Sequence, residues 1–134
     1  MESTLTLKKI SQTFTAREQN EGAGAKVRRF IGVENLRNLD PFLMLDLFRV
    51  ALPAGFPDHP HRGFETVTYM LSGRISHEDF KGHKGVIGPG DIQWMTAGKG
   101  IVHSEIPMSF TEPAYGFQLW LNLDKKNKFR DPRY

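Results

Sequence analysis

The chain of 134 residues contains no cysteine. This absence excludes a disulfide framework, a thiolate metal site and a cysteine nucleophile, so any bound metal must take nitrogen and oxygen ligands. Long apolar runs are also missing, because none approaches the roughly 18 residues that a membrane-spanning helix needs. The N-terminus lacks the basic-then-apolar order of a secretory signal. We therefore expect a protein of the cytoplasm, the nucleus or both, with no membrane partner.

Helix signals are scarce, whereas turn residues are frequent, with 13 Gly and 8 Pro. The segments between the turns are short and rich in β-branched and aromatic residues, as strands require. We expect strands at residues 27–32, 42–50, 66–71, 75–79, 85–87, 92–96, 101–105 and 114–123. No helix-length periodic segment separates them, which excludes an α/β fold. Closely spaced short strands in a chain of this length predict one all-β domain, a sandwich or barrel.

Charge offers little functional information. The formal net charge is +3, with basic clusters at residues 26–29 and 125–133. A small positive excess on a short domain is usually solvated surface, so we expect no direct binding of nucleic acid. Residues 125–134 are polar and interrupted by proline, and we interpret them as a tail or a linker.

Two pairs of candidate metal ligands repeat a spacing of two residues. His59 and His61 flank Pro60, which keeps the segment extended, so both imidazoles point to one side. His103 and Glu105 repeat this arrangement in an apolar stretch. If the two segments lie on neighbouring walls of one barrel, three imidazoles and one carboxylate converge on its interior. This donor set suits a non-haem transition metal and leaves positions for a substrate or oxygen.

The spacing leaves alternatives open. Glu65 lies four residues after His61, so the same even parity also puts its carboxylate on the ligand face, where it could replace Glu105. His77 and His83 lie in a polar segment and are interpreted as ordinary surface or core histidines. Imidazole and carboxylate ligands suit zinc, copper, manganese and nickel as well as iron.

Several longer motifs carry a family resemblance. PDHPHRGFE at residues 57–65, GDIQWMTAG at 90–98 and GIVHSE at 100–105 resemble the pirin family, and the similarity continues through residues 24–29, 39–43 and 118–123. It covers nearly the whole chain. The resemblance implies the cupin fold, a jelly-roll β-barrel also described as a double-stranded β-helix.

The same resemblance implies a site and two activities. It predicts a mononuclear iron centre, ferrous or ferric, on His59, His61, His103 and Glu105, with Glu65 in a supporting role beside a ligand imidazole. Pirins are associated with oxygen-dependent ring cleavage of flavonols such as quercetin, in which Glu105 would accept the substrate proton. In eukaryotic members they are also associated with redox-sensitive co-regulation of transcription through a transcription-factor partner.

Two departures from the family pattern qualify these expectations. Pirins carry a second cupin-like domain, so residues 1–124 correspond to the N-terminal cupin domain and 125–134 to a tail or a truncated linker. A fragment and a one-domain relative are both open. Where the family has an acidic pair before Phe48, this chain has Asp46 and Leu47. The apolar segment 114–123 further predicts a patch that a second copy covers in a two-fold dimer, unless both faces of that strand are buried within its own barrel.

Overall fold

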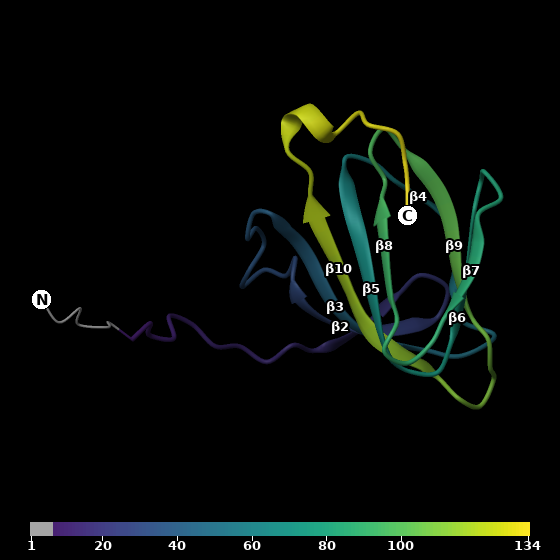
Figure 1. The fold of residues 1–134 in the computed structure, drawn as a ribbon. Helices are drawn as coiled ribbons and strands as arrows, with labels where there is room; N and C mark the ends of the chain where they lie inside the picture. Colours follow the sequence, from purple (N-terminus) through teal and green to yellow (C-terminus); the bar gives the residue numbers. More distant parts are fainter. Residues whose placement is uncertain (1–6) are drawn as a thin grey trace, which may run out of the picture.

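Two β-sheets face each other in the computed structural model, which describes residues 7–134 (Figure 1). The described elements are β1 (Glu18–Glu21), β2 (Ala25–Ile31), β3 (Phe42–Val50), β4 (Phe56–His61), β5 (Phe64–Ser72), β6 (Ile75–Asp79), β7 (Lys84–Ile87), β8 (Ile92–Thr96), β9 (Ile101–Pro107), β10 (Ala114–Asn122) and the 3-10 helix η1 (Lys125–Asn127). Within these residues there is no helix of the length and apolarity that a bilayer crossing requires.

The sheet topology is that of a jelly roll. One sheet has the strand order β1-β2-β3-β10-β5-β8 and the other β4-β9-β6-β7, and every described strand pair is antiparallel. An isolated bridge between Ala23 and Gly55 joins the sheets at one corner. Elsewhere the ladders of the described strands stay separate, so the sheets do not close into one hydrogen-bonded barrel. The predicted all-β, single-domain jelly-roll class is confirmed.

The expected strands agree closely with the observed ones. The predictions at 42–50, 75–79 and 92–96 coincide with β3, β6 and β8, and the other five differ from the observed bounds by at most two residues at either end. Two strands are missing from the predicted set. β4 was expected only as an extended segment around Pro60, and β1 was not predicted because its four residues are polar and show no apolar alternation. It forms by pairing with β2, where Glu18 lies opposite Arg28 and Asn20 opposite Lys26.

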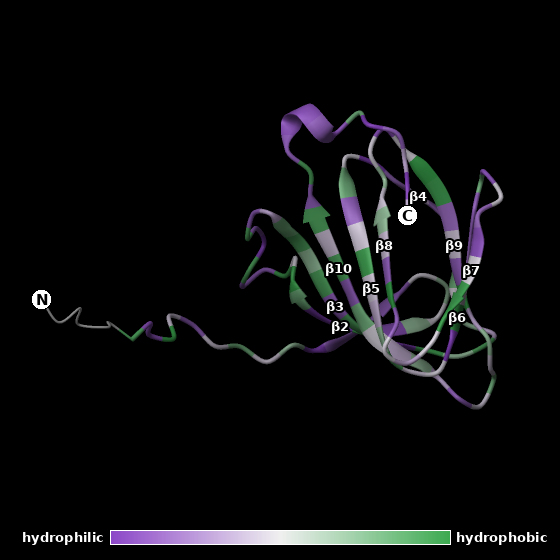
Figure 2. Ribbon diagram, in the orientation of Figure 1, coloured by the Kyte–Doolittle hydropathy of each residue, from purple (hydrophilic) through white to green (hydrophobic). Residues whose placement is uncertain are grey.

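The interior changes from apolar to polar along the strands. A buried cluster of Ala25, Val27, Phe48, Val50, Met70, Ile75, Ile87 and Ala114 fills one part of the space between the sheets. Further along β5, Thr66 and Thr68 are buried, and on β9 so are His103 and Glu105. Burying polar groups costs free energy unless they find partners. A polar zone in the middle of a small β protein therefore indicates a site. Figure 2 shows the same mixture of hydrophobic and hydrophilic residues along the strands.

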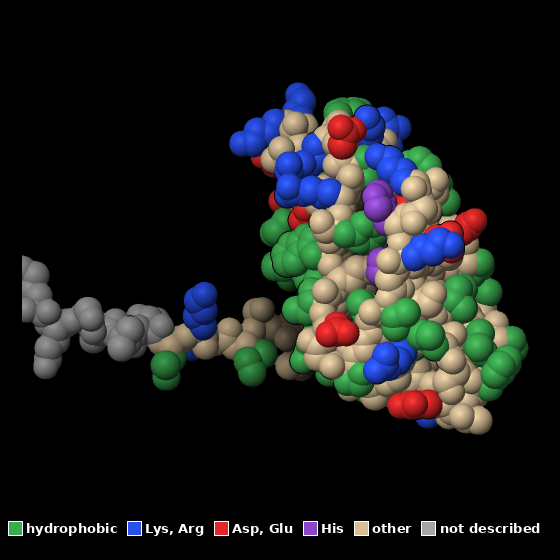
Figure 3. All heavy atoms as spheres, turned by 45° about the vertical axis from the view of Figure 1, so that its right-hand side comes forward, with side chains coloured by type: hydrophobic (Ala, Val, Ile, Leu, Met, Phe, Trp, Pro, Cys, Tyr) green, Lys and Arg blue, Asp and Glu red, His purple; other side chains and the backbone are tan. Residues whose placement is uncertain are grey.

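The C-terminal segment runs back to the free edge of β8. Thr96 and Arg133 exchange two backbone hydrogen bonds, of 2.8 and 3.1 Å, and the amide of Lys99 donates to the carbonyl of Arg130 over 2.9 Å. Gly98 allows this approach: its φ is +52°, and a Cβ there would overlap the Arg130 carbonyl oxygen. Figure 3 shows Lys and Arg side chains gathered at the upper end of the molecule, the end where η1 lies in Figure 1.

Candidate metal centre

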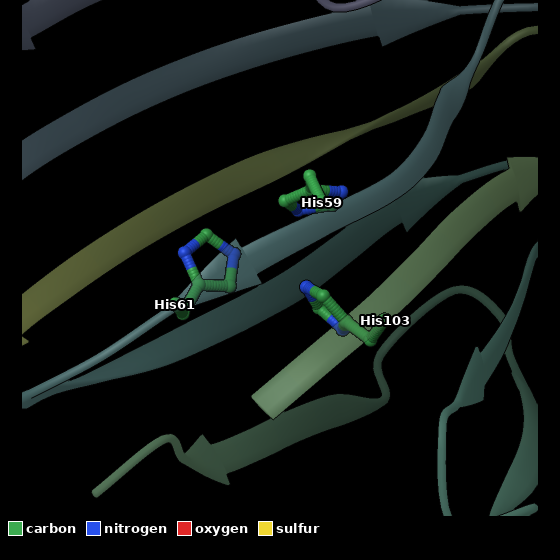
Figure 4. Close-up of side chains that lie close together, drawn as sticks. All are labelled: His59, His61 and His103. Carbon is green, nitrogen blue, oxygen red and sulfur yellow. The ribbon is translucent and has the colours of Figure 1, made fainter. Parts of the chain in front are cut away.

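Three imidazoles meet between the sheets. His59 and His61 lie on β4, and His103 lies on the neighbouring β9 directly opposite His59. Their ligand atoms all lie within 4.8 Å of one another. The ring centroids are separated by 4.5 Å for His59 and His103, 4.7 Å for His59 and His61, and 5.0 Å for His61 and His103. Figure 4 shows the three rings gathered around a common point, as a shared ion would require.

The local sequence of β4 explains this arrangement. The strand is the outermost member of its sheet, so Pro60 interrupts no central ladder. A register shift between Phe56 and His59 adjusts the strand just before the first imidazole. Nδ1 of His59 lies 2.8 Å from the carbonyl oxygen of Pro57 and donates to it, which leaves Nε2 free. A metal-bound histidine commonly makes such a bond with its other ring nitrogen.

The electrostatics favour neutral imidazoles. Burial, followed by the nearby His59, lowers the pKa of His61 to about 4. Burial first, and then the neighbouring histidines, lower the pKa of His103 to about 3. Neutral imidazole is the form that binds metals. Both ring nitrogens of His103 are buried, and neither has a hydrogen-bond partner among the described residues. Because a metal would satisfy one of them, the residues fit a bound metal ion.

Glu105 lies beside this triad but outside it. It is two residues from His103 on β9 and is buried. The Thr68 hydroxyl donates to its Oε1 over 3.2 Å, and Nε2 of Gln118 donates to its Oε2 over 3.2 Å. Burial raises the pKa of Glu105, while His59 and these two hydrogen bonds oppose the rise. Glu105 is not among the ligand atoms within 4.8 Å of one another, so its role as the fourth ligand stays a prediction.

Glu65 does not face the histidines, and the prediction that it supports a ligand imidazole is wrong. Its carboxylate accepts hydrogen bonds from Nε1 of Trp94 over 3.0 Å and from the Thr96 hydroxyl over 2.6 Å. The even spacing from His61 gave the wrong face for Glu65 because a turn lies between them: Gly63, with a φ of +78°, separates β4 from β5. Residue alternation holds within a strand and not across a turn.

The two remaining histidines differ in their surroundings. Nδ1 of His83 lies 2.7 Å from Oδ2 of Asp79, and the His83 side chain is exposed, as the surface interpretation requires. His77 is half-buried, lies across from Glu105 on the neighbouring strand and packs against Tyr134, with ring centroids 5.3 Å apart. Nothing in the polar sequence around His77 signals this inward position.

A cavity of about 900 Å³ opens beside the triad. Its walls include aromatic side chains from both sheets: Phe48, Phe56, Phe64 and Trp120. Trp120 packs against His61, with ring centroids 5.2 Å apart. A flat, largely apolar ligand would fit such walls while presenting a polar group to the histidines.

An ion-paired group also lines this cavity, and sequence reasoning did not place it there. Arg29 bonds to Asp46 and Glu21, and all three line the cavity. Alternation along β2 was the available signal, because Arg29 is two residues after the buried Val27. Asp46 is on the inward face of β3, while Leu47 is on the other face.

The family model described as Pirin matches residues 24–121. The chain belongs to the pirin family. A pirin-like protein from Solanum lycopersicum is 66% identical over 119 residues, covering 89% of this chain and 40% of the relative. The chain thus spans less than half the length of that pirin.

Solved structures of pirin relatives share the cupin fold. Quercetin 2,3-dioxygenase from Acinetobacter baumannii is 31% identical, with a TM-score of 0.79 over 90% of this chain and 42% of the other. A bacterial pirin from Escherichia coli, solved in complex with nickel(II), is 28% identical, with a TM-score of 0.78 over 88% of this chain and 52% of the other. A metal-bound pirin of the same fold agrees with a metal site at the three histidines.

Proposed function

We propose that this pirin domain holds one non-haem iron ion on His59, His61, His103 and Glu105 and supports oxygen-dependent ring cleavage of a flavonol. The observation that carries the proposal is the histidine triad, which borders an aromatic-walled cavity of about 900 Å³. The quercetin 2,3-dioxygenase named above supports the substrate class. Nickel(II), which the Escherichia coli relative binds, is the alternative metal.

Each part of the site has a task in this proposal. A bound metal ion supplies open positions that activate oxygen and hold a substrate oxygen. The aromatic side chains Phe56, Phe64 and Trp120 orient the flat substrate and exclude water. Glu105 accepts the proton of the substrate hydroxyl at a carboxylate oxygen. The hydrogen bonds from Thr68 and Gln118 hold that carboxylate in place.

Elemental analysis combined with a turnover assay tests the proposal. The purified chain should carry close to one equivalent of transition metal, and the iron-loaded protein should consume oxygen and quercetin together. Metal without turnover would contradict the enzymatic proposal and leave the transcription-factor-binding alternative, for which oxidation-dependent partner binding is the matching assay. A chain without stoichiometric metal would contradict the site itself.

We propose that a second copy of the chain binds the outer face of the six-stranded sheet. Cross-strand neighbours share a face, and two apolar rows cross this one: Leu47, Phe117, Tyr69 and Ile92, then Leu45, Leu119, Val67 and Trp94. Ile92 is 60% exposed and Trp94 51%. Leu47, which replaces an acid of the family pattern, lies in the first row. An exposed apolar face marks an interaction surface, and a two-fold axis brings the same face of two copies together.

Sedimentation tests this association. The 134-residue chain should sediment as a dimer at high micromolar concentration. Ile92→Glu should shift it to the monomer, because the variant puts a charge at the exposed end of the first apolar row. Val86→Glu is the matched control, since Val86 is an exposed residue of the other sheet. A wild-type monomer at that concentration contradicts the dimer.

A further inference from the structure

Arg29 presents an ordered guanidinium to the cavity. Its Nε donates to Oδ1 of Asp46 over 2.8 Å and its Nη2 to Oδ2 over 2.7 Å, a bidentate pair. Nη2 also donates to Oε2 of Glu21 over 2.7 Å. The Asp46 side chain is 3% exposed, that of Arg29 20% and that of Glu21 42%, so the group runs from the interior to the rim.

The backbone fixes this group on the sheet that does not carry the three histidines. Arg29 and Asp46 are direct partners in the pairing of β2 with β3, and the register shifts immediately after Arg29. Such irregularities often re-aim a side chain next to a functional site. Strands β2 and β3 belong to the six-stranded sheet, whereas the three histidines belong to the other sheet. A ligand in the cavity can therefore contact the triad at one end and Arg29 at the other.

Two groups of the cluster remain available to a ligand. Asp46 accepts hydrogen bonds from Nε and Nη2 of Arg29, whereas no partner among the described residues binds Nη1. Oε1 of Glu21 has only a long contact, 3.4 Å, from the amide of Gly22. A donor and an acceptor thus lie side by side. A phenolic hydroxyl can accept from the first and donate to the second.

The charge of the cluster selects against anions. One guanidinium faces two carboxylates, so the group has one formal positive and two formal negative charges. A carboxylate or phosphate on a ligand would meet repulsion from Glu21, whereas neutral ring hydroxyls would not. The surrounding aromatic walls also favour a flat ring over a flexible polar chain.

We propose that Arg29 and Glu21 form a specificity-determining pair that binds the ring hydroxyls of the flavonol on the side away from the metal. This inference rests on the proposed function, because it names which flavonols the cavity prefers. These are flavonols with hydroxyl groups on the ring that lies away from the metal. Asp46 acts as a positioning residue, because its buried carboxylate fixes the orientation of the Arg29 guanidinium.

The test compares quercetin with 3-hydroxyflavone, which keeps the metal-binding oxygens but lacks the other hydroxyls. Binding is measured by tryptophan fluorescence quenching on metal-free and iron-loaded protein, so that the readout does not depend on turnover. Wild-type protein should prefer quercetin. Glu21→Gln should lower that preference about tenfold, because a hydrogen bond to a charged group is replaced by a weaker one. The loss should be confined to quercetin.

Two further variants complete the experiment. Glu18→Gln is the matched control, because Glu18 is an exposed acid of the same strand and should leave the preference unchanged. Arg29→Lys keeps the positive charge but loses the planar set of N–H donors, and it should also lower the preference for quercetin. An unchanged preference in Glu21→Gln, or no binding of either flavonol to wild type, overturns the inference. If the wild type turns over quercetin and Glu21→Gln keeps the preference, the proposed function stands and the specificity pair is wrong. If Glu21→Gln loses the preference but the wild type shows no turnover, the specificity pair stands and the proposed function is wrong.

Discussion

His61→Ala is expected to remove most of the bound metal and to lower metal affinity by more than about 100-fold, since losing a group that only orients a ligand already costs 10- to 100-fold. His61 is one of three imidazoles whose ligand atoms lie within 4.8 Å of one another. Its aromatic neighbours outside the triad, Phe64 and Trp120, cannot take the place of the lost imidazole as metal ligands. Elemental analysis and metal titration measure the effect, and thermal unfolding without metal checks that the variant folds.

Two variants serve as controls for this loss. His83→Ala removes an exposed imidazole that pairs with Asp79, and Glu65→Gln changes a carboxylate that bonds to Trp94 and Thr96. Both should retain metal at the wild-type level. If Glu65→Gln lost more metal than His61→Ala, the triad would not be the metal site.

Glu105→Gln is expected to lower kcat by about 100-fold or more at saturating metal, the typical contribution of a positioned general base. The variant keeps the size of the side chain but removes the carboxylate that we propose as proton acceptor. Thr68 and Gln118 both donate to the native carboxylate. The Thr68 hydroxyl can rotate and accept from the new amide, so the fold should tolerate the change. Steady-state kinetics with iron-loaded protein measure kcat, and metal content is determined on the same sample.

The matched control is Glu78→Gln, which changes an exposed glutamate on β6 that pairs with Lys84. Its kcat should equal that of wild type. A Glu105→Gln enzyme with full metal content and kcat within about twofold of wild type would exclude Glu105 as the proton acceptor, because the expected loss is about 100-fold or more.

Sequence reasoning located the histidine triad because its signal is local. The two-residue spacing of His59 and His61, with Pro60 between them, shows that they share one face. That β9 pairs with β4, so that His103 lies opposite His59, is a long-range contact that spacing alone cannot specify. The motif resemblance supplied that contact. Parity failed at Glu65 because Gly63 turns the chain between two strands.

The basic residues at 26–29 illustrate a second limit. As a run of charge they are typical of solvated surface, yet they lie on a strand and alternate in direction. Lys26 and Arg28 are exposed, whereas Arg29 reaches the cavity and pairs with Asp46. Asp46 accounts for the inward position of Arg29, because a buried carboxylate on the adjacent strand stabilises an inward guanidinium. Composition carries no information about such a pairing.

The position of β10 has a consequence for how the protein folds during synthesis. This strand comes last among the described strands, but it lies between β3 and β5 in the six-stranded sheet. Until residues 114–122 leave the ribosome, β1-β2-β3 and β5-β8 remain two separate ribbons with open edges. Pairing Trp120 with Met44 then closes a long loop, which makes the step entropically costly and slow. Nascent chains that stall before β10 therefore expose strand edges, which can pair with other chains.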